Sequence, residues 1–359
     1  MAVNQPGKNG PVRRKYLLAL GALAVISVMA VLVASGADPA EVGEPVDVDD
    51  LPVLADDVPG PDQADGWIGS EPLTRASLDG SVVVYDFWTY SCVNCVRTLP
   101  HLAAWYDRYQ RDGLVIVGVH SPEFEFEKDR GNVERAVGDL GVDWPVALDP
   151  ERRVWNAFSN RYWPAKYVVD RKGRLRYVHY GEGAYDETED VLRELLGVDP
   201  DSPRADDENE PDVPNLGQLT PELYIGGGRG TTASPQGLSD PDGDGVPGGE
   251  ATFTLPDTLP VDTFALDGAW SISTESATAQ EPGAAIVLHY RGQEVNLVLA
   301  AGGSTPTSVT VSVDGGEPRT VEVGEPDLVN LLRDGPAGEH TMRIEAGSAG
   351  LAAYAFTFG

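Results

Sequence analysis

Two cysteines, Cys92 and Cys95, are the residues whose type and spacing point most directly to chemistry, and the sequence holds no others. A disulfide between residues this close constrains little of the unfolded chain, so a structural cross-link here would add little stability. The same spacing suits two other roles, thiol–disulfide exchange and metal binding. The pair therefore predicts redox or metal chemistry, and its surroundings must decide between them.

Zinc binding is the weaker of these two interpretations. A structural zinc site made of thiolates requires a second pair of ligands at close spacing. The five histidines provide no such pair, because they are scattered along the chain at His101, His120, His179, His289 and His340. A redox-active dithiol is therefore favoured.

The segments around the pair place it at a strand–helix junction. Residues 81–88 (SVVVYDFW) form a mostly apolar run that predicts a buried strand. Residues 95–113 carry apolar side chains at helical spacing and end at a glycine, which predicts a helix. Cys92 then lies near the helix N-terminus, where backbone N–H groups and the helix dipole stabilise a thiolate and lower the pKa. Cys95, one turn further on, can attack the mixed disulfide that Cys92 forms.

The rest of residues 66–197 alternates between predicted strands and helices. The pattern predicts strands at residues 114–120, 144–148, 165–170 and 175–181 and helices at residues 133–140 and 188–197. Such alternation implies an α/β domain with a central mixed sheet and flanking helices.

An acidic, proline-rich linker at residues 198–215 separates this domain from a second one. Residues 216–359 are rich in Gly, Thr, Ser and Val, in short alternating runs separated by turn signals such as the DGG at residues 314–316. This pattern is typical of an all-β sandwich or jelly roll.

Composition limits the range of partners. The 359 residues are 41% hydrophobic, which is enough for real cores, and carry a net charge of −31 with a pI near 4.3. This charge excludes nucleic acid or an anionic membrane as the main partner. We interpret the acidic side chains as a solubilising surface.

The N-terminus predicts export. A basic cytoplasmic N-terminus at residues 1–15 precedes residues 16–35, an uncharged stretch long enough to cross one bilayer as a transmembrane or signal-anchor helix. Cleavage near Ala37 would instead give a secreted protein. A flexible acidic linker is predicted at residues 36–65. In both cases the cysteines work extracytoplasmically, where disulfides persist.

These motifs carry a family resemblance. The DFWTYSCVNC segment, Pro100 and the downstream YWPAKYVVD resemble the thioredoxin fold, and more closely the TlpA/ResA-type exported thiol–disulfide oxidoreductases. The segments WTYSCVNCVRTLPHL, GVHSPEFEFEK and YAFTFG are most similar to the C-terminal part of DipZ-type proteins. There a thioredoxin-like domain is followed by a β-sandwich resembling carbohydrate-binding modules. The resemblance covers residues 67–359.

The resemblance implies a role for each residue of the redox site. Cys92 matches the attacking thiol and Cys95 the resolving thiol. Asp86 matches the buried acid that accepts a proton from the resolving cysteine, and burial in a strand should raise its pKa toward the range useful for that transfer.

It also implies a substrate-binding edge. Pro164 matches a cis-proline that packs against the active-site disulfide, although an ordinary trans turn is the alternative. The backbone of Trp163 would pair with a bound substrate as an added strand does. Trp88 is expected beside the cysteines, either as a substrate contact or as a core aromatic.

Two departures from the family pattern bear on mechanism. Thr98 stands where ResA-like proteins have an acid, which leaves Asp86 as the best candidate base. The dipeptide between the cysteines, Val93–Asn94, has no cation. We therefore expect a potential in the reducing half of the thioredoxin-fold range, about −270 to −120 mV.

The partners follow from the resemblance. The substrates implied are exported disulfide-containing proteins, in cytochrome c maturation or in redox homeostasis. No cofactor is required. Because the chain has one apolar segment where most DipZ-like chains carry a polytopic domain, its electrons are expected from a membrane donor of the CcdA/DsbD type.

Two alternative functions stay open. The first is a cell-surface glycan- or protein-binding module on a thioredoxin-like scaffold, with Trp270 and Tyr290 either stacking on sugars or filling the core. The second is a peroxide-reducing redoxin. Thr89 precedes Cys92 by three residues as in peroxiredoxins, but Tyr85 occupies the place of their proline.

Two groups of acidic residues lie outside the redox motif. Glu123, Glu125 and Glu127 are expected to solubilise a loop and the start of a helix. Within residues 239–250, the alternating acids Asp240, Asp242 and Asp244 match the first half of a calcium loop, but position twelve is Ala251 rather than an acid. The alternative to calcium binding is a solvated loop.

Overall fold

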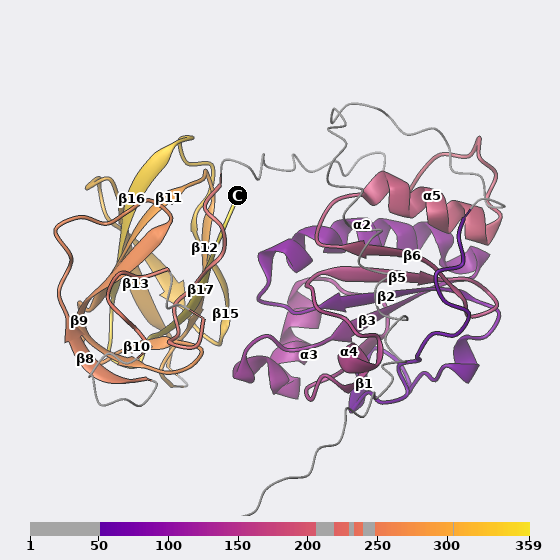
Figure 1. Cartoon of the computed structure of the whole chain (residues 1–359), viewed down its shortest axis with the longest axis horizontal. Coiled ribbons are helices and arrows are strands. Elements are labelled where there is room, and N and C mark those ends of the chain that lie inside the picture. Colours follow the sequence, from indigo (N-terminus) through magenta and orange to yellow (C-terminus); the bar gives the residue numbers. More distant parts are fainter. Residues whose placement is uncertain (1–50, 206–218, 230–232, 240–247, 304) are drawn as a thin grey trace, which may run out of the picture. The chain divides into compact units, whose positions relative to one another are not determined.

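A computed structural model describes residues 51–205, 219–229, 233–239, 248–303 and 305–359 (Figure 1). The predicted cytoplasmic N-terminus, the predicted membrane helix at residues 16–35 and the acids Asp240, Asp242 and Asp244 lie outside these ranges. Within them, no helix combines the length and the apolar character needed to span a membrane.

The first domain contains a six-stranded sheet in the order β1-β4-β3-β2-β5-β6 (Figure 1). Strands β2, β3 and β4 run parallel, whereas β1, β5 and β6 pair antiparallel with their neighbours. This mixed sheet with flanking helices confirms the predicted thioredoxin-like α/β class. Its main elements are β1 Gly66–Ile68, β2 Val82–Trp88, α2 Val93–Tyr109, β3 Leu114–His120, α3 Arg130–Asp139, β4 Val146–Leu148, α4 Arg153–Ala157, β5 Ala165–Val169, β6 Leu175–Tyr180 and α5 Tyr185–Leu196.

Strand β2 lies in the middle of this sheet, and all seven of its residues are buried. Its side chains alternate between two apolar clusters, with Val82 and Val84 in one and Val83, Tyr85 and Phe87 in the other. Helices α2 and α5 cover the first face (Figure 1), and α4 contributes to the second. Because both faces are covered, the strand reads as a continuous apolar run.

Helix α2 begins directly after Cys92, which caps it in an extended conformation. Its buried face includes Leu99, Leu102 and Trp105, which pack on the sheet. The chain then leaves the helical region through a short 3-10 turn and Gly113, whose φ of 100° favours glycine. The helix start is therefore held between a central strand and a packed helix face.

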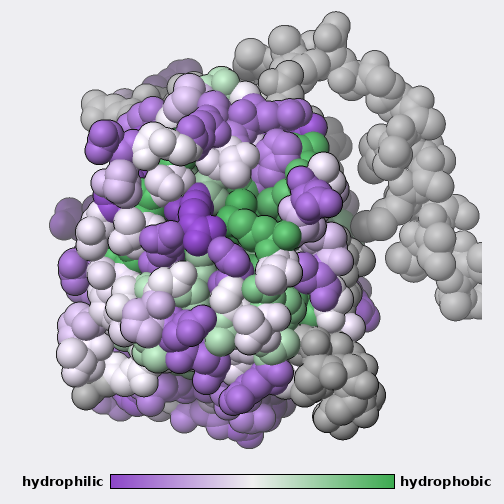
Figure 2. Space-filling model, turned by 90° about the vertical axis from the view of Figure 1, so that its left-hand side faces the viewer, coloured by the Kyte–Doolittle hydropathy of each residue, from purple (hydrophilic) through white to green (hydrophobic). Residues whose placement is uncertain are grey.

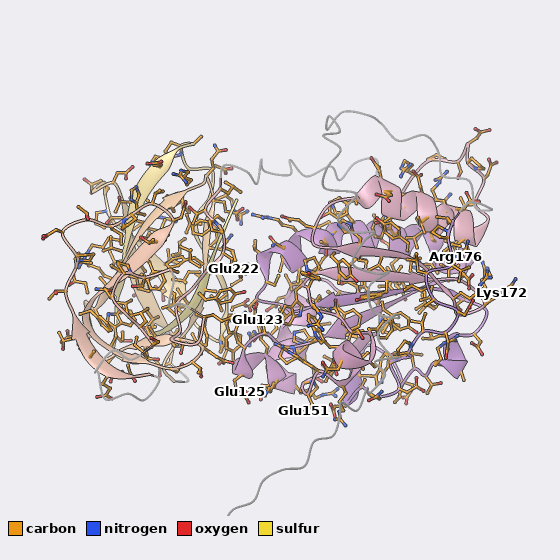
Figure 3. The ribbon with its side chains drawn as sticks, viewed as in Figure 1. Glu123, Glu125, Glu151, Lys172, Arg176 and Glu222 are labelled. Atoms are coloured by element: carbon orange, nitrogen blue, oxygen red, sulfur yellow. The ribbon has the colours of Figure 1, made fainter. Side chains whose placement is uncertain are left out.

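The predicted flexible linker at residues 36–65 is wrong over residues 51–65, which pack on the first domain. Leu51 and Val58 are buried. The guanidinium of Arg176, labelled in Figure 3, donates to the carbonyl oxygen of Leu51 at 2.6 Å. The acidic composition concealed two apolar side chains whose burial offsets the entropy of ordering this segment.

The second predicted linker, residues 198–215, is also ordered in its first part. Arg193 of α5 is buried, and its guanidinium donates to several carbonyl oxygens that follow the helix. These acceptors belong to Asp199, Pro200, Ser202 and Pro203. One buried cation therefore fixes the segment, while residues 206–218 lie outside the described ranges.

The second domain is all-β, as the sequence predicts, with eleven connected strands. Strand β9 pairs with β11 along its first half and with β8 and β10 along its second half. Gly268, with φ +87°, lies between these halves, and a Cβ there would meet Ala284 at 3.2 Å. The strands are β7 Leu223–Tyr224, β8 Gly249–Phe253, β9 Thr263–Ile272, β10 Ala277–Ala279, β11 Ala285–Arg291, β12 Val295–Ala300, β13 Thr307–Val313, β14 Arg319–Val323, β15 Asp327–Leu332, β16 Glu339–Ala346 and β17 Ala352–Phe358.

The core of the β domain is a single apolar cluster that includes Trp270 and Tyr290. Both side chains are almost completely buried. Neither presents a ring face on which a sugar could stack, so the alternative in which they fill the core is the correct one. The face shown in Figure 2 is mostly hydrophilic or intermediate in hydropathy, and hydrophobic residues are interspersed on it.

Candidate redox site

Cys92 lies between the end of β2 and the first turn of α2. Its side chain is half-buried, and its sulfur accepts a hydrogen bond from the backbone N–H of Cys95 at 3.4 Å. The free N–H groups and dipole of a helix N-terminus stabilise negative charge at this position. The structure therefore places the predicted attacking thiol at a helix N-terminus, where it is partly exposed to solvent.

Cys95 is fully buried, and no disulfide joins it to Cys92. Burial raises the pKa of the Cys95 thiol well above its ordinary value, and the hydrogen bond and charge of Cys92 raise it further. A backbone hydrogen bond from Thr89 acts in the opposite direction. Cys95 consequently remains a thiol until a base removes its proton, which is the order of events that a resolving cysteine requires.

Asp86 of β2 is the buried acid, and it lies opposite Lys166 of β5 in the antiparallel register. Both side chains have no exposed surface. Neither carboxylate oxygen of Asp86 has a hydrogen-bond partner within the described part of the chain, and the same is true of the Lys166 ammonium. Burial raises the pKa of Asp86 to about 6, although the charge of Lys166 lowers it.

Lys166 is a site residue that sequence reasoning missed. Burial lowers the pKa of its ammonium, while the charges of Asp86, Cys95 and Glu182 raise it. The ammonium lies 5.9 Å from the centroid of the Tyr185 ring and has no hydrogen bond within the described residues. Because a buried cation without hydrogen bonds is costly, its position beside the dithiol points to an electrostatic role. The sequence does contain an indication of this buried lysine, because Lys166 interrupts AKYVV, a run that otherwise indicates a buried strand.

The Trp163–Pro164 peptide bond is cis. The register that pairs Phe87 with Ala165 continues toward Pro164, so this bend lies beside the end of β2, where the chain turns toward Cys92. The Trp163 indole N–H donates to the carbonyl oxygen of Ser121 at 2.9 Å. In the described ranges, the backbone N–H and C=O of Trp163 make no hydrogen bond, so this edge is open to an incoming strand.

Trp88 does not fit its predicted role in substrate binding. Its side chain has no exposed surface and packs in the same cluster as Cys95. The ring meets that of His120 edge-on, with centroids 5.3 Å apart. A substrate cannot contact a fully covered ring, so the core alternative is correct for Trp88.

The expectation that Glu127 solubilises a loop is wrong, because its side chain is buried. One carboxylate oxygen accepts a hydrogen bond from the Ser91 hydroxyl at 2.5 Å. The other accepts from the backbone N–H of Glu123 at 2.5 Å and of Phe124 at 2.9 Å. Burial raises the pKa of Glu127 to about 6. Glu127 thus fixes the residue that precedes Cys92.

Thr89 faces His120. Its hydroxyl lies 3.4 Å from the His120 Nε2 atom, and the ring of His120 stacks on that of Tyr90. Burial lowers the pKa of His120 to about 3, so the imidazole is neutral at physiological pH. The loop before Cys92 is therefore backed by a neutral, packed ring.

A charged group also follows the cysteines along α2. The Arg97 guanidinium lies 3.7 Å from a carboxylate oxygen of Glu182 and 2.9 Å from one of Glu294, the residue that directly precedes β12. Its guanidinium also approaches the Phe358 carbonyl oxygen at 3.4 Å. Arg97 therefore joins the helix that starts at the dithiol to residues of the β domain.

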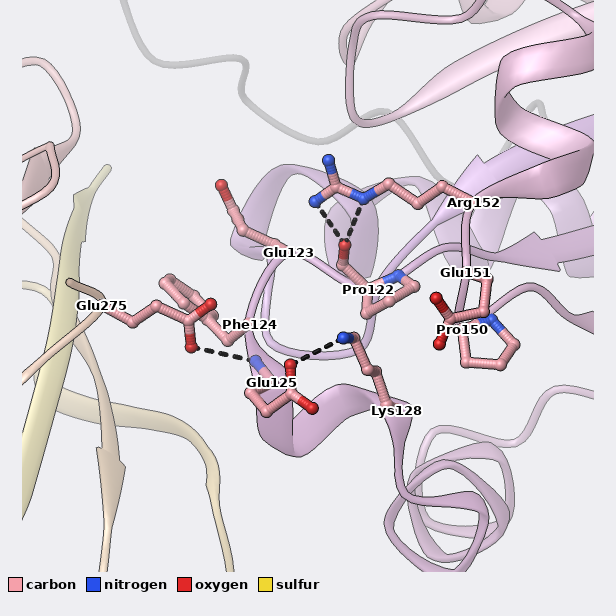
Figure 4. Close-up of a pocket in the computed structure, with 9 residues that line it drawn as sticks. All are labelled: Pro122, Glu123, Phe124, Glu125, Lys128, Pro150, Glu151, Arg152 and Glu275. Carbon is pink, nitrogen blue, oxygen red and sulfur yellow. Dashed lines mark hydrogen bonds and ion pairs between the residues drawn. The ribbon is translucent and has the colours of Figure 1, made fainter. Parts of the chain in front are cut away.

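A hollow of about 260 Å³ is lined by residues of the two loops after β3 and β4 and by Glu275 (Figure 4). Its two cations are already engaged, because Lys128 pairs with Glu125 at 2.6 Å and Arg152 donates to the Pro122 carbonyl oxygen. The hollow does not include either cysteine. We therefore do not regard it as the redox site.

Metal binding gains no support from the described residues. Among them, no cluster of three His, Cys, Asp or Glu side chains could hold an ion. The candidate calcium ligands Asp240, Asp242 and Asp244 fall outside the described ranges, so calcium binding by that loop stays a prediction.

Two family models match this chain. Residues 55–178 match the model of the AhpC/TSA family, and residues 220–359 match that of the thioredoxin-like C-terminal domain. The thiol–disulfide oxidoreductase YkuV of Bacillus subtilis is 34% identical over 116 residues, which are 32% of this chain and 77% of YkuV. The chain belongs to the family of thioredoxin-like thiol–disulfide oxidoreductases.

A relative that spans both domains is the protein DipZ of Mycobacterium tuberculosis. It is 37% identical over 303 residues, which are 82% of this chain and 41% of DipZ. The chain thus spans about two fifths of the DipZ protein it matches, and the predicted resemblance is confirmed. The solution structure of a thioredoxin-like protein in the oxidised form is 30% identical, covering 40% of this chain and 97% of that protein, with a TM-score of 0.36.

Proposed function

We propose that Cys92 and Cys95 reduce or exchange disulfides in proteins outside the cytoplasm. The observation that supports this most is the difference between the two thiols. Cys92 is half-buried at a helix N-terminus, and Cys95 is fully buried behind it. An accessible nucleophile with a shielded second thiol is the arrangement that dithiol exchange requires.

In the reducing direction, the Cys92 thiolate attacks one sulfur of the substrate disulfide. The substrate S–S bond breaks, its first sulfur leaves as a thiolate that takes up a proton, and Cys92 is joined to the second sulfur. The Cys95 thiolate then attacks Cys92 and releases the second substrate thiolate. Two electrons pass from the dithiol to the substrate, and the enzyme is left with a Cys92–Cys95 disulfide.

Asp86 is proposed to accept the Cys95 proton in the second step. Its carboxyl pKa of about 6 leaves it mostly ionised at neutral pH. This pKa is also nearer to that of a thiol than the pKa of an ordinary aspartate is, which favours proton transfer between the two groups. The proton then passes to the departing substrate thiolate. Lys166, opposite Asp86, stabilises the negative charge that moves between Asp86 and Cys95.

Substrate is proposed to add as an extended segment along Trp163. The unpaired backbone groups of Trp163 supply one donor and one acceptor next to the cis peptide bond. Main-chain pairing of this kind recognises a strand of any sequence, which suits an enzyme that acts on several unfolded proteins.

We place this activity outside the cytoplasm, with residues 16–35 as the anchor or, if cleaved near Ala37, as an export signal. Oxidising surroundings supply disulfides to reduce, but they also require a source of electrons. A membrane donor of the CcdA/DsbD type would re-reduce the enzyme. Cytochrome c maturation and general redox homeostasis are the two tasks we propose.

Insulin reduction by dithiothreitol tests the activity. The purified chain should accelerate precipitation of the insulin B chain, and Cys92→Ala should reduce the rate to that of dithiothreitol alone. Cys95→Ser is the matched variant, because it should accumulate mixed disulfides on Cys92 that mass spectrometry detects. Equal rates for the wild-type protein and Cys92→Ala would contradict the proposal.

Peroxide reduction is the second candidate, favoured by the match of residues 55–178 to the AhpC/TSA family. Tyr85 is buried in β2, and Thr89 contacts His120. We therefore expect hydrogen peroxide to be consumed far more slowly than insulin disulfides are reduced. A stopped-flow measurement showing faster oxidation of Cys92 by peroxide than by a peptide disulfide would reverse this preference.

A further inference from the structure

Two tyrosines form an exposed aromatic surface on the first domain. Tyr162 is 54% exposed and Tyr180 is 45% exposed, although large hydrophobic side chains are seldom so open in the described ranges. Their ring centroids lie 5.0 Å apart, with an angle of 51° between the planes. We call this pair the tyrosine ledge.

The tyrosine ledge is held rigidly from below. Tyr180 meets the ring of Tyr167 edge-on, with centroids 6.1 Å apart, and Tyr167 meets Phe87 of the central strand at 5.5 Å. The Asn160 side-chain amide donates to the Tyr162 carbonyl oxygen at 3.0 Å. The aromatic stack therefore extends from the core to the solvent, and the exposed rings lose little freedom when something binds to them.

The ledge borders the proposed substrate edge. Tyr162 immediately precedes Trp163, and Tyr180 pairs with Ala165, the residue after the cis-proline. The backbone N–H of Gly181 donates to the Pro164 carbonyl oxygen at 2.8 Å, so β6 is fixed to this bend. A segment paired with Trp163 would therefore have both rings as neighbours.

We propose that the tyrosine ledge binds an aromatic or long aliphatic side chain of the substrate, within two residues of the cysteine under attack. This inference rests on the proposed function. A strand paired with Trp163 passes beside Tyr162, the preceding residue, and diagonal neighbours across a strand pair are about 7–8 Å apart, within reach of aromatic and long side chains. Aromatic rings prefer aromatic or aliphatic partners there, and the chain's net charge of −31 disfavours acidic ones.

The ledge thereby selects among substrates that main-chain pairing alone would not distinguish. Unfolded and misoxidised polypeptides expose apolar side chains near their cysteines, whereas small disulfides and polar peptides do not. The substrate class is therefore disulfides in unfolded polypeptides with apolar flanking residues.

Two peptides that differ at one position test this inference. Each carries a single cysteine joined to glutathione, with Phe or Ser two residues before that cysteine. With dithiothreitol as reductant, the wild-type enzyme should show a kcat/KM about tenfold higher for the Phe peptide, mainly through KM. Tyr162→Ala and Tyr180→Ala should each reduce this preference, and the double variant should abolish it.

Leu54→Ala is the matched control, because Leu54 lies in the same domain and is 52% exposed. It should keep the full preference. Hydroxyethyl disulfide, which has no flanking residues, should be reduced equally by all variants. Equal kcat/KM for the two peptides in the wild type, or an unchanged preference in the double variant, overturns the inference while the enzyme remains active. Failure of the wild type to reduce any of the three disulfides overturns the proposed function and this inference with it.

Discussion

The interiors of the two domains differ in charge. In the β domain, the buried polar residues within the described ranges are uncharged, namely Thr220, Ser234, Ser276, Asn296 and Thr357. The thioredoxin-like domain buries Asp86, Lys166 and Glu127 close to the dithiol. Burying charge costs free energy unless it is paired and hydrogen-bonded. The described β core therefore avoids this cost, whereas the first domain carries it at the residues that we propose act on the dithiol.

Not every buried charge in the first domain is part of the site. Asp149 is buried too, but its carboxylate accepts hydrogen bonds from the Ser121 hydroxyl and from the N–H groups of Val154 and Trp155. The burial of Asp149 therefore has a structural reason, because its carboxylate bonds the free N–H groups at the start of α4. Asp86 and Lys166 have no such bonds. The lack of hydrogen bonds within the described part of the chain, rather than burial alone, distinguishes Asp86 and Lys166 from Asp149.

The largest expected effect comes from removing the proposed base. Asp86→Asn should slow the release of substrate from Cys92 by about 10²–10⁴-fold, because the Cys95 proton loses its acceptor. In the wild type this step should accelerate as the pH rises through about 6, where Asp86 ionises, and the variant should lose that dependence. Quenched-flow trapping of the mixed disulfide measures both.

Asp107→Asn is the matched control, because Asp107 is exposed on the same helix as Cys95. Its release rate should equal that of the wild type at every pH. An Asp86→Asn enzyme that releases substrate at the wild-type rate would remove Asp86 from the mechanism.

A substitution in the β core should change stability and leave activity unchanged. Trp270→Ala should reduce the free energy of unfolding by about 3–5 kcal/mol, because it leaves a large cavity in an apolar cluster. Insulin reduction per folded molecule should not change. Urea unfolding followed by fluorescence gives the first quantity, with Leu255→Ala, an exposed residue of the same domain, as control. A loss of activity in the folded variant would show that the β core is not purely structural.

Lys166→Met tests whether the charge of Lys166 acts on Asp86, because it removes the charge and keeps a side chain of similar length. Without the ammonium, the pKa of Asp86 should rise, since Lys166 is the charge that lowers it. The pH midpoint of substrate release should therefore move upward by about 1–2 units. Lys172→Met, at an exposed turn labelled in Figure 3, should leave the midpoint in place. A midpoint that is unchanged in Lys166→Met would show that the pair is not coupled.

The smallest effect concerns Glu127. Its pKa is raised from 4.5 to about 6 in the folded state, so the folded protein binds the proton more tightly than the unfolded chain does. The associated stability is full below pH 4.5 and is lost as the pH rises through about 6, a loss of about 2 kcal/mol. Glu127→Gln should flatten that part of the stability curve in urea titrations between pH 4 and 7. Glu125→Gln, at an exposed position, should leave it as steep as in the wild type.

Local pattern was sufficient for much of this protein. The strand before Cys92 and the helix after it follow from an apolar run and from helical spacing, because both elements bury a face defined by consecutive residues. The β domain follows from alternation and turn signals in the same way. Pattern failed at Leu51 and Val58, whose acidic neighbours concealed two buried side chains, and at Glu127, whose charge suggested solvent.

The sequence by itself determined the dithiol, the order of the two domains and the acid in the strand before the cysteines, since these depend on residue type and local spacing. Only the tertiary structure decided that Lys166 lies opposite Asp86, that Glu127 holds Ser91, and that Tyr162 meets Tyr180. Each of these contacts joins segments far apart in the chain through strand register and loop packing. Register is selected by the burial of whole faces, so no short stretch of sequence specifies it.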